Sequence, residues 1–373
     1  NVMANSTRAA IDDGASVSAR NDLNLAADAD QIAVTAVVAG AGAGKVGVAG
    51  ALSTNVLVGH TEAVVRQGAQ INTYTATPFF NGTAQNVNIT ARDDSIVVGV
   101  AGGGAGGGTA GVGAALGTTV LVKTVQAHIE DDADGASVAQ VNADYNVRID
   151  ARATEAIASI SAGFGGGNKT GVSGAAALVV NTNSVQAGIG KSTIVDSNGN
   201  VLVNAENDTT AMLLAGAGAV GGTAGVGGSA AVATLVGNTK AYIGDNATVN
   251  ARGHAAAVPV YAGETVLTVQ SETPVEPGNL LAKRTEYARG LSVTAYNRQN
   301  LINTVVGGSY GGKAGVAATV SANVIANTAE ASIGRNAKIN EHNTTANLAQ
   351  QVRVKAINET LLVNTAGALG AGG

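Results

Sequence analysis

The chain has 373 residues, of which 45% are hydrophobic, 13% charged and 3% aromatic, with 52 glycines, no cysteine and a formal net charge of −5. This composition excludes ordinary disorder, and the lack of a basic cluster argues against a nucleic-acid partner. The absence of cysteine excludes disulfides, thiol catalysis and cysteine-based zinc sites.

One segment recurs through the chain without a gap. It is GVAGALSTNVLVGHTEAVV at 47–65, and it ends in the same pattern as residues 1–11. Further full copies begin at Gly111, Gly171, Gly225 and Gly315. Self-similarity of this kind predicts a repeat protein, and because the repeats cover nearly the whole chain we expect one elongated domain over 1–373.

Each unit reads as a strand, a glycine-rich tip, a long strand and then two short strands separated by turns. The units open at positions 32, 96, 157, 212, 301 and 361, and short closing strands such as VNITA at 87–91 end them. The richness in Val, Thr and Ala favours strands. We therefore predict an all-β, elongated β-solenoid (β-helix) of about 60-residue repeats, with tip glycines that supply positive φ and close backbone approach. A unit of this length forms more than one coil, or one coil with a β-hairpin at its tip; the pattern leaves both open.

The alternation within 47–65 predicts which side chains are buried. One row of period two is expected to face the dry interior: Val48, Gly50, Leu52, Thr54, Val56 and Val58. From Thr61 the apolar residues occupy the other parity, which predicts a bulge or corner near Gly59 and His60. The half before this corner has small residues on both faces and is expected to be buried on both sides.

Residues 255–290 break the pattern as an insertion in the fourth full repeat, read as a loop or a small hairpin. Insertions in repeat proteins map to surface loops that frequently bind partners, although drift in a tolerated loop explains the segment equally well. The expected contacts in it are Glu264, Lys283 and Arg284. A second expected contact surface is the outward polar row that follows the corner: Glu62, Gln126, Gln186, Lys240 and Glu330.

Catalytic and metal sites find little support. The four histidines occupy non-equivalent places in their units and form no triad, so the chain is not expected to be an enzyme. Asp131, Asp132 and Asp134 lie in a glycine-bearing acidic loop of the kind that suits Ca²⁺. The loop lacks EF-hand spacing and occurs once, so a solvated acidic turn is the favoured interpretation and no cofactor is assigned.

The run AGVGAALGTTVLVKTVQAHI and the run GVGGSAAVATLVGNTKAYIGDNATVNARG resemble the repeats of filamentous-haemagglutinin-like and leukotoxin-family filamentous adhesins, and of related autotransporter passengers. The resemblance covers nearly all of the chain except 255–290. It implies a β-helical shaft, export to the surface of a Gram-negative cell, and a role in adhesion, aggregation or display of a distal domain. It carries no catalytic residues with it.

The predicted function is therefore a non-catalytic shaft of a large secreted adhesin, in contact with a receptor or glycan on a host or neighbouring cell, with self-association as a further possibility. No apolar run suits a membrane helix, and membrane insertion of this segment is not expected. Because the chain starts and stops inside repeats, we read it as part of a longer protein. Two alternatives stay open: a carbohydrate-active β-helix enzyme or tailspike, and the subunit of a self-assembling extracellular fibre.

Overall fold

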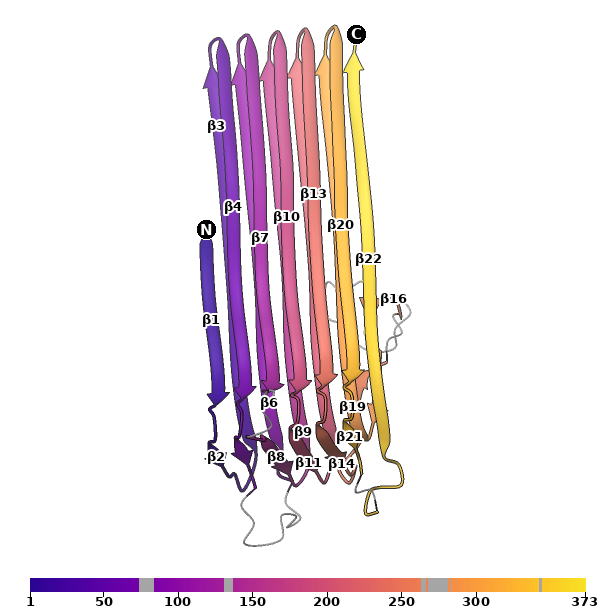
Figure 1. The fold of residues 1–373 in the computed structure, drawn as a ribbon. Coiled ribbons are helices and arrows are strands. Elements are labelled where there is room, and N and C mark those ends of the chain that lie inside the picture. The colour runs from indigo at the N-terminus through magenta and orange to yellow at the C-terminus, as the bar shows by residue number, and fades with distance from the viewer. Residues whose placement is uncertain (74–83, 131–136, 263–265, 268–280, 283, 342–343) are drawn as a thin grey trace.

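The computed structural model describes residues 1–73, 84–130, 137–262, 266–267, 281–282, 284–341 and 344–373. In this part of the chain the all-β solenoid is confirmed: the strands form three parallel sheets of six strands each (Figure 1). Several predicted site residues lie outside the described residues: Asp131, Asp132, Asp134, Glu264 and Lys283.

Two of the sheets are built from long strands. The first long sheet contains, in order, β1 (Val2–Ile11), β4 (Val46–Val65), β7 (Ala110–Ile129), β10 (Thr170–Ile189), β13 (Ala224–Ile243) and β20 (Ala314–Ile333). The second long sheet contains β3 (Leu23–Ala43), β6 (Val87–Gly107), β9 (Val147–Gly167), β12 (Val201–Gly221), β19 (Gly290–Gly311) and β22 (Gln351–Gly372). The two sheets lie face to face and run from the base to the glycine-rich tips.

The third sheet closes the base of each coil. It contains the short strands β2 (Ser16–Val17), β5 (Gln70–Ile71), β8 (Gln140–Ala143), β11 (Ile194–Ser197), β14 (Thr248–Ala251) and β21 (Lys338–Ile339). Where the three sheets meet, a core of Ala, Val, Leu and Ile side chains is sealed from water, and Ile149 and Val141 are fully buried in it. Burial of a side chain of this size contributes about 1.5–3 kcal/mol.

One repeat unit is one coil. Each strand pairs in parallel with the equivalent strand of the next unit, so that Val48 lies beside Val112. The predicted closing strand and the opening strand of the next unit are continuous, because 87–91 forms the beginning of β6. The glycine tip does not make a paired hairpin, since β3 and β4 belong to different sheets.

Asparagine side chains form a ladder of hydrogen bonds at the turns that precede strands β6, β9 and β12 of the second long sheet. Asn146 Oδ1 accepts from the backbone N–H of Asn200 at 2.9 Å, and Asn200 Oδ1 accepts from that of Gly290 at 2.7 Å. Asn86 accepts from the N–H of Asn146 in the same way at 3.3 Å. The repeated Asn therefore satisfies backbone donors that the turn leaves unpaired.

The predicted corner in the organising strand is wrong. β4 pairs with β7 residue by residue from Val46 to Val65 with no bulge. Val48 is 66% exposed and Leu52 59% exposed, while Ala49 and Ala51 point inward. The row that was expected to be dry is the outer face, so this half of the strand is buried on one side only. The small residues are inside because the sheets approach too closely for larger side chains.

The leading glycine of each copy marks this close approach. A Cβ built on Gly47 would lie 2.3 Å from the carbonyl oxygen of Gly106, well inside van der Waals contact. The expected positive φ at the tips is not observed. Among the described residues the glycines with positive φ are Gly14, Gly68, Gly253 and Gly290, which lie beside the short strands β2, β5 and β14 or at the start of β19.

The insertion at 255–290 contains strands of its own. β15 (Val258–Tyr261) pairs with β18 (Thr285–Ala288), and β16 (Val266–Leu267) pairs with β17 (Leu281–Ala282), both antiparallel. The insertion lies to one side of the shaft, with β16 well above the short base strands (Figure 1). The described residues of the insertion therefore contain two antiparallel strand pairs.

Candidate functional site

The half of the long sheets nearest the tips, here called the leaf, has an unusual exterior. The leaf comprises residues 32–58, 96–122, 156–182, 210–236, 300–326 and 361–373. Exposed apolar side chains stand on both of its outer faces, among them those of Val34, Val38, Val48, Leu52, Leu116, Phe164, Met212, Leu214, Val226, Val306, Val316 and Val320. Its charged residues are Lys45, Lys169 and Lys313, all at the tip turns.

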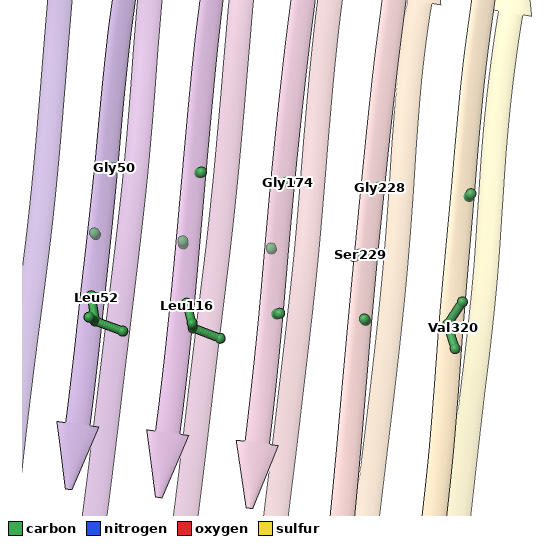
Figure 2. A pocket seen from close by; sticks show the side chains of 14 residues that line it. Gly50, Leu52, Leu116, Gly174, Gly228, Ser229 and Val320 are labelled. Carbon is green, nitrogen blue, oxygen red and sulfur yellow. The ribbon is translucent and has the colours of Figure 1, made fainter.

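A shallow groove of about 640 Å³ crosses five strands of the first long sheet on this apolar exterior. Its floor is a row of small residues and its wall is the next outward row: Gly50, Ala114, Gly174, Gly228 and Ala318 below Leu52, Leu116, Ala176, Ala230 and Val320. Figure 2 shows Leu52, Leu116 and Val320 in one line across the strands. The groove offers no charged group, so apolar packing is what it provides.

The predicted polar row lies on the same outer face, between the leaf and the base. Strand register brings its members into one ladder: Arg8, Glu62, Gln126, Gln186, Lys240 and Glu330. Arg8 Nε lies 2.7 Å from Glu62 Oε2, and Lys240 Nζ lies 3.2 Å from Glu330 Oε1. These charges therefore pair along the ladder. No partner contact by this row is tested, and it stays a prediction.

The insertion covers a second hollow on the outer face of the second long sheet. The cavity has a volume of about 310 Å³ and is lined on one side by Arg148, Asp150, Arg152 and Glu206 and on the other by Val258, Pro259, Val260 and Tyr261. The Tyr261 ring stacks on Tyr296 with centroids 4.6 Å apart, and its hydroxyl donates to Glu206 Oε2 at 2.6 Å. Burial raises the pKa of Tyr261, so the hydroxyl stays a donor.

Of the residues predicted in the insertion, only Arg284 is described, and it is exposed. The contacts that hold the insertion come from other side chains: Arg353 Nε donates to Glu286 Oε1 at 2.6 Å. Nothing in the repeat pattern marks these residues, because the insertion has no equivalent in the other coils.

A buried polar layer, here called the seam, separates the apolar core of the leaf from the core of the base. It runs between the two long sheets through every coil and includes Gln31, Thr61, Asp93, Lys123, Glu155, Asn183, Asn207, Thr209 and Asn297. Large side chains from one long sheet face small residues of the other across the seam. Where the first long sheet has Gly59, the second supplies Gln31 and Asp93, whose Nε2 and Oδ2 atoms lie 3.1 and 3.0 Å from the position that a Gly59 Cβ would occupy.

Three charged side chains meet in the seam with no exposure to water. Lys123 Nζ lies 2.6 Å from Asp93 Oδ1 and 3.6 Å from Glu155 Oε1, and all three side chains are 0% exposed. Glu155 Oε2 accepts from Asn183 and Thr209, each at 2.7 Å, while Oε1 has no hydrogen bond. Burial raises the pKa of Glu155 to about 7, against the opposing charge of Lys123.

The seam was missed at the sequence level. Lys123 follows Thr119 and Leu121 at the inward parity of its strand, and this was the available signal for a buried lysine. The expectation that the outer row is the dry one hides this signal. Asp93 lies at a buried, inward position of β6.

Among the described residues, no group of three His, Asp or Glu side chains is arranged to hold a metal ion. The same residues contain no helix suited to crossing a membrane.

The ionisation of Glu155 predicts a pH dependence of stability. Because the pKa is raised from 4.5 to about 7 on folding, the native state holds this proton more tightly than the unfolded state. The contribution of Glu155 is therefore greatest below pH 4.5, and it falls by about 3 kcal/mol as the pH rises to about 7. The measurement is urea unfolding from pH 4 to 8 for the wild type and Glu155→Gln. Parallel stability curves for the two proteins would contradict the assignment.

No protein-family model, curated protein or solved structure matches this chain. The resemblance to filamentous adhesin repeats accordingly stays a prediction made from the sequence.

Proposed function

We propose that the chain is a non-catalytic shaft segment of a secreted bacterial cell-surface adhesin, and that its leaf binds the leaf of a second copy. The surface location and adhesive role rest on the resemblance of the repeats. The observation that carries the association is the leaf itself, whose two outer faces are apolar and whose charges lie only at the tips. Lateral pairing of shafts would promote aggregation of the cells that bear them.

The size of the apolar face favours a protein partner. In the first long sheet it spans five strands about 4.8 Å apart and about 13 residues with a rise of about 3.3 Å, which is about 1,000 Å². Apolar patches on monomers rarely exceed about 600 Å². A standard interface buries about 800 Å² on each partner, so one face suffices for a stable pair.

The surface shape of this apolar face favours a second copy of the chain as the partner. The strands of the leaf run nearly straight and side by side (Figure 1), and flat sheets of this kind are typically stabilised by stacking. The row that contains Val48, Val226 and Val316 projects beside the groove floored by Gly50 and its equivalents. A two-fold axis between copies places the projecting row of each in the groove of the other.

The test is the oligomeric state of the purified chain. We expect analytical ultracentrifugation to show dimers or larger species that dissociate on dilution. Leu116→Glu places a carboxylate on the wall of the groove, where pairing would bury it, and should weaken association at least about tenfold, or about 1.4 kcal/mol. The matched control is Thr124→Glu, which lies on the outer face of the same strand β7 but below the leaf and outside the polar row, and should associate like the wild type.

Three outcomes would contradict the pairing of leaves. These are a wild type that remains monomeric at high concentration, equal weakening by both variants, and a folded monomer that floats with phosphatidylcholine vesicles. The last result would assign the leaf to a lipid surface instead.

A further inference from the structure

The buried cluster of Lys123, Asp93 and Glu155 joins the two long sheets. Lys123 comes from β7 in the first long sheet, whereas Asp93 and Glu155 come from the neighbouring strands β6 and β9 of the second. The amine and the carboxylate of Asp93 are in hydrogen-bond contact at 2.6 Å. This contact holds the amine next to the carboxyl carbon, and groups held this close need only a small rotation to bring nitrogen and carbon to the separation of about 3–3.5 Å from which attack occurs.

The surroundings of Asp93 polarise its carboxyl group. Oδ2 accepts hydrogen bonds from Thr61 Oγ1 at 3.1 Å and from Gln31 Nε2 at 3.3 Å, while Oδ1 faces the amine and also accepts from Ser95 Oγ at 3.4 Å. Fixed donors on one carboxyl oxygen stabilise the negative charge that develops there when the carbon is attacked. Glu155 stands on the other side of the amine with Oε1 free of hydrogen bonds, 3.6 Å from Nζ.

We infer that Lys123 and Asp93 form an intramolecular isopeptide bond, with Glu155 as the proton relay. A proton passes from the Lys123 ammonium to Asp93, which leaves a neutral amine beside a carboxylic acid. The C–N bond then forms as Nζ attacks Cγ of Asp93, and Glu155 moves a proton from the nitrogen to the departing hydroxyl. The C–O bond breaks and one water leaves, so an ammonium and a carboxylate become an amide and water with no change in oxidation state.

The dry, close-packed site favours this condensation over the ion pair. Reactants held in contact have effective concentrations of about 10⁵–10⁸ M relative to free groups in solution. Two buried charges are exchanged for a neutral amide, which removes their desolvation cost. The raised pKa of Glu155 keeps a proton available near neutral pH. Amide formation removes both the ammonium that lowers this pKa and the Asp93 carboxylate that raises it, and because Lys123 has the larger effect the pKa of Glu155 rises further.

The bond is specific to one coil among the described residues. The positions equivalent to Lys123 in neighbouring strands hold Gly59, Asn183, Gly237 and Asn327, none of which carries an amine. The linkage would tie the two long sheets together between the leaf and the base. A shaft cross-linked there resists separation of its sheets under load.

The test is the mass of the denatured recombinant chain. We expect intact-mass spectrometry to give a value lower than the sequence mass by one water. Proteolysis should release a branched fragment that joins the segment around Asp93 to the segment around Lys123. The fragment map is essential because succinimide formation at Asp13-Gly14 would lose the same mass without a branch.

Variants separate the linkage from an ordinary ion pair. Lys123→Met and Glu155→Gln should each have the full mass of their own sequence. Amide formation in Asp93→Asn releases ammonia instead of water, so this variant should be lighter than its own sequence mass by one ammonia. Lys169→Met, which removes an exposed tip lysine, should keep the loss of water. A wild type that folds to β-structure by circular dichroism and yet has its full sequence mass would overturn the inference, and so would a branch that persists in Lys123→Met.

Discussion

Leu213→Asp is expected to unfold the solenoid locally, whereas Leu214→Asp is expected to leave it folded. Leu213 is fully buried between the long sheets, in one cluster with Val179, Leu235 and Leu301. The substitution removes about 2–3 kcal/mol of apolar burial and places a carboxylate where no water reaches it. We expect a total loss of about 5 kcal/mol or more, comparable to the whole stability of many domains.

The neighbouring leucine is the matched control because it has the same side chain and the opposite orientation. Leu214 is 39% exposed on the outer face of the leaf, and its substitution should change the free energy of unfolding by about 1 kcal/mol or less. Urea unfolding followed by circular dichroism, at concentrations low enough to avoid association, measures both variants. Equal destabilisation would show that the two faces of β12 are not divided into an inside and an outside.

Gly103→Val is expected to be the second severe change. A Cβ at Gly103 would lie 1.9 Å from the carbonyl oxygen of Ala114 in the opposite sheet. The sheets cannot open locally, because the adjacent Gly163 holds the same close spacing in the next coil. Overpacking against backbone costs about 3 kcal/mol or more.

Gly104→Val is the corresponding control. No atom lies within 4 Å of a Cβ at Gly104, and a glycine within a strand is itself unfavourable by about 0.5–1 kcal/mol. We expect this variant to match or slightly exceed the stability of the wild type in thermal unfolding. If both glycine variants melt at the wild-type temperature, the two sheets of the leaf are not in close contact at Gly103.

The repeat made most of the fold predictable. Similar residues at fixed intervals lie beside one another in neighbouring coils, so each residue must be able to pack against its equivalent in the next coil. The observed pairing of Ala63 with Ala127 follows that rule. The sequence does not predict that each unit is a single coil. Two strands joined by a glycine-rich tip have the same residue pattern whether they pair edge to edge in one sheet or pack face to face in two sheets.

The inside and the outside of the leaf were assigned the wrong way round, for a physical reason. Hydrophobic side chains normally face the interior, and the valine row with Val48 followed that expectation. Near the tips the sheets are so close that only residues such as Gly47 and Ala49 fit between them, whereas leucines such as Leu213 fill the interior nearer the seam. Near the tips, volume and not hydrophobicity therefore selects the interior, so the valines face outward.

The sequence by itself determined the repeat, the strand register and the all-β class, because these depend on local propensity and on self-pairing at a fixed period. Only the tertiary structure decided which face of the leaf is dry and that Lys123 meets Asp93 and Glu155. These three residues belong to opposite sheets, and the point at which they meet depends on the length of each tip turn and the distance between the sheets. Neither quantity is encoded in the pattern of a single strand.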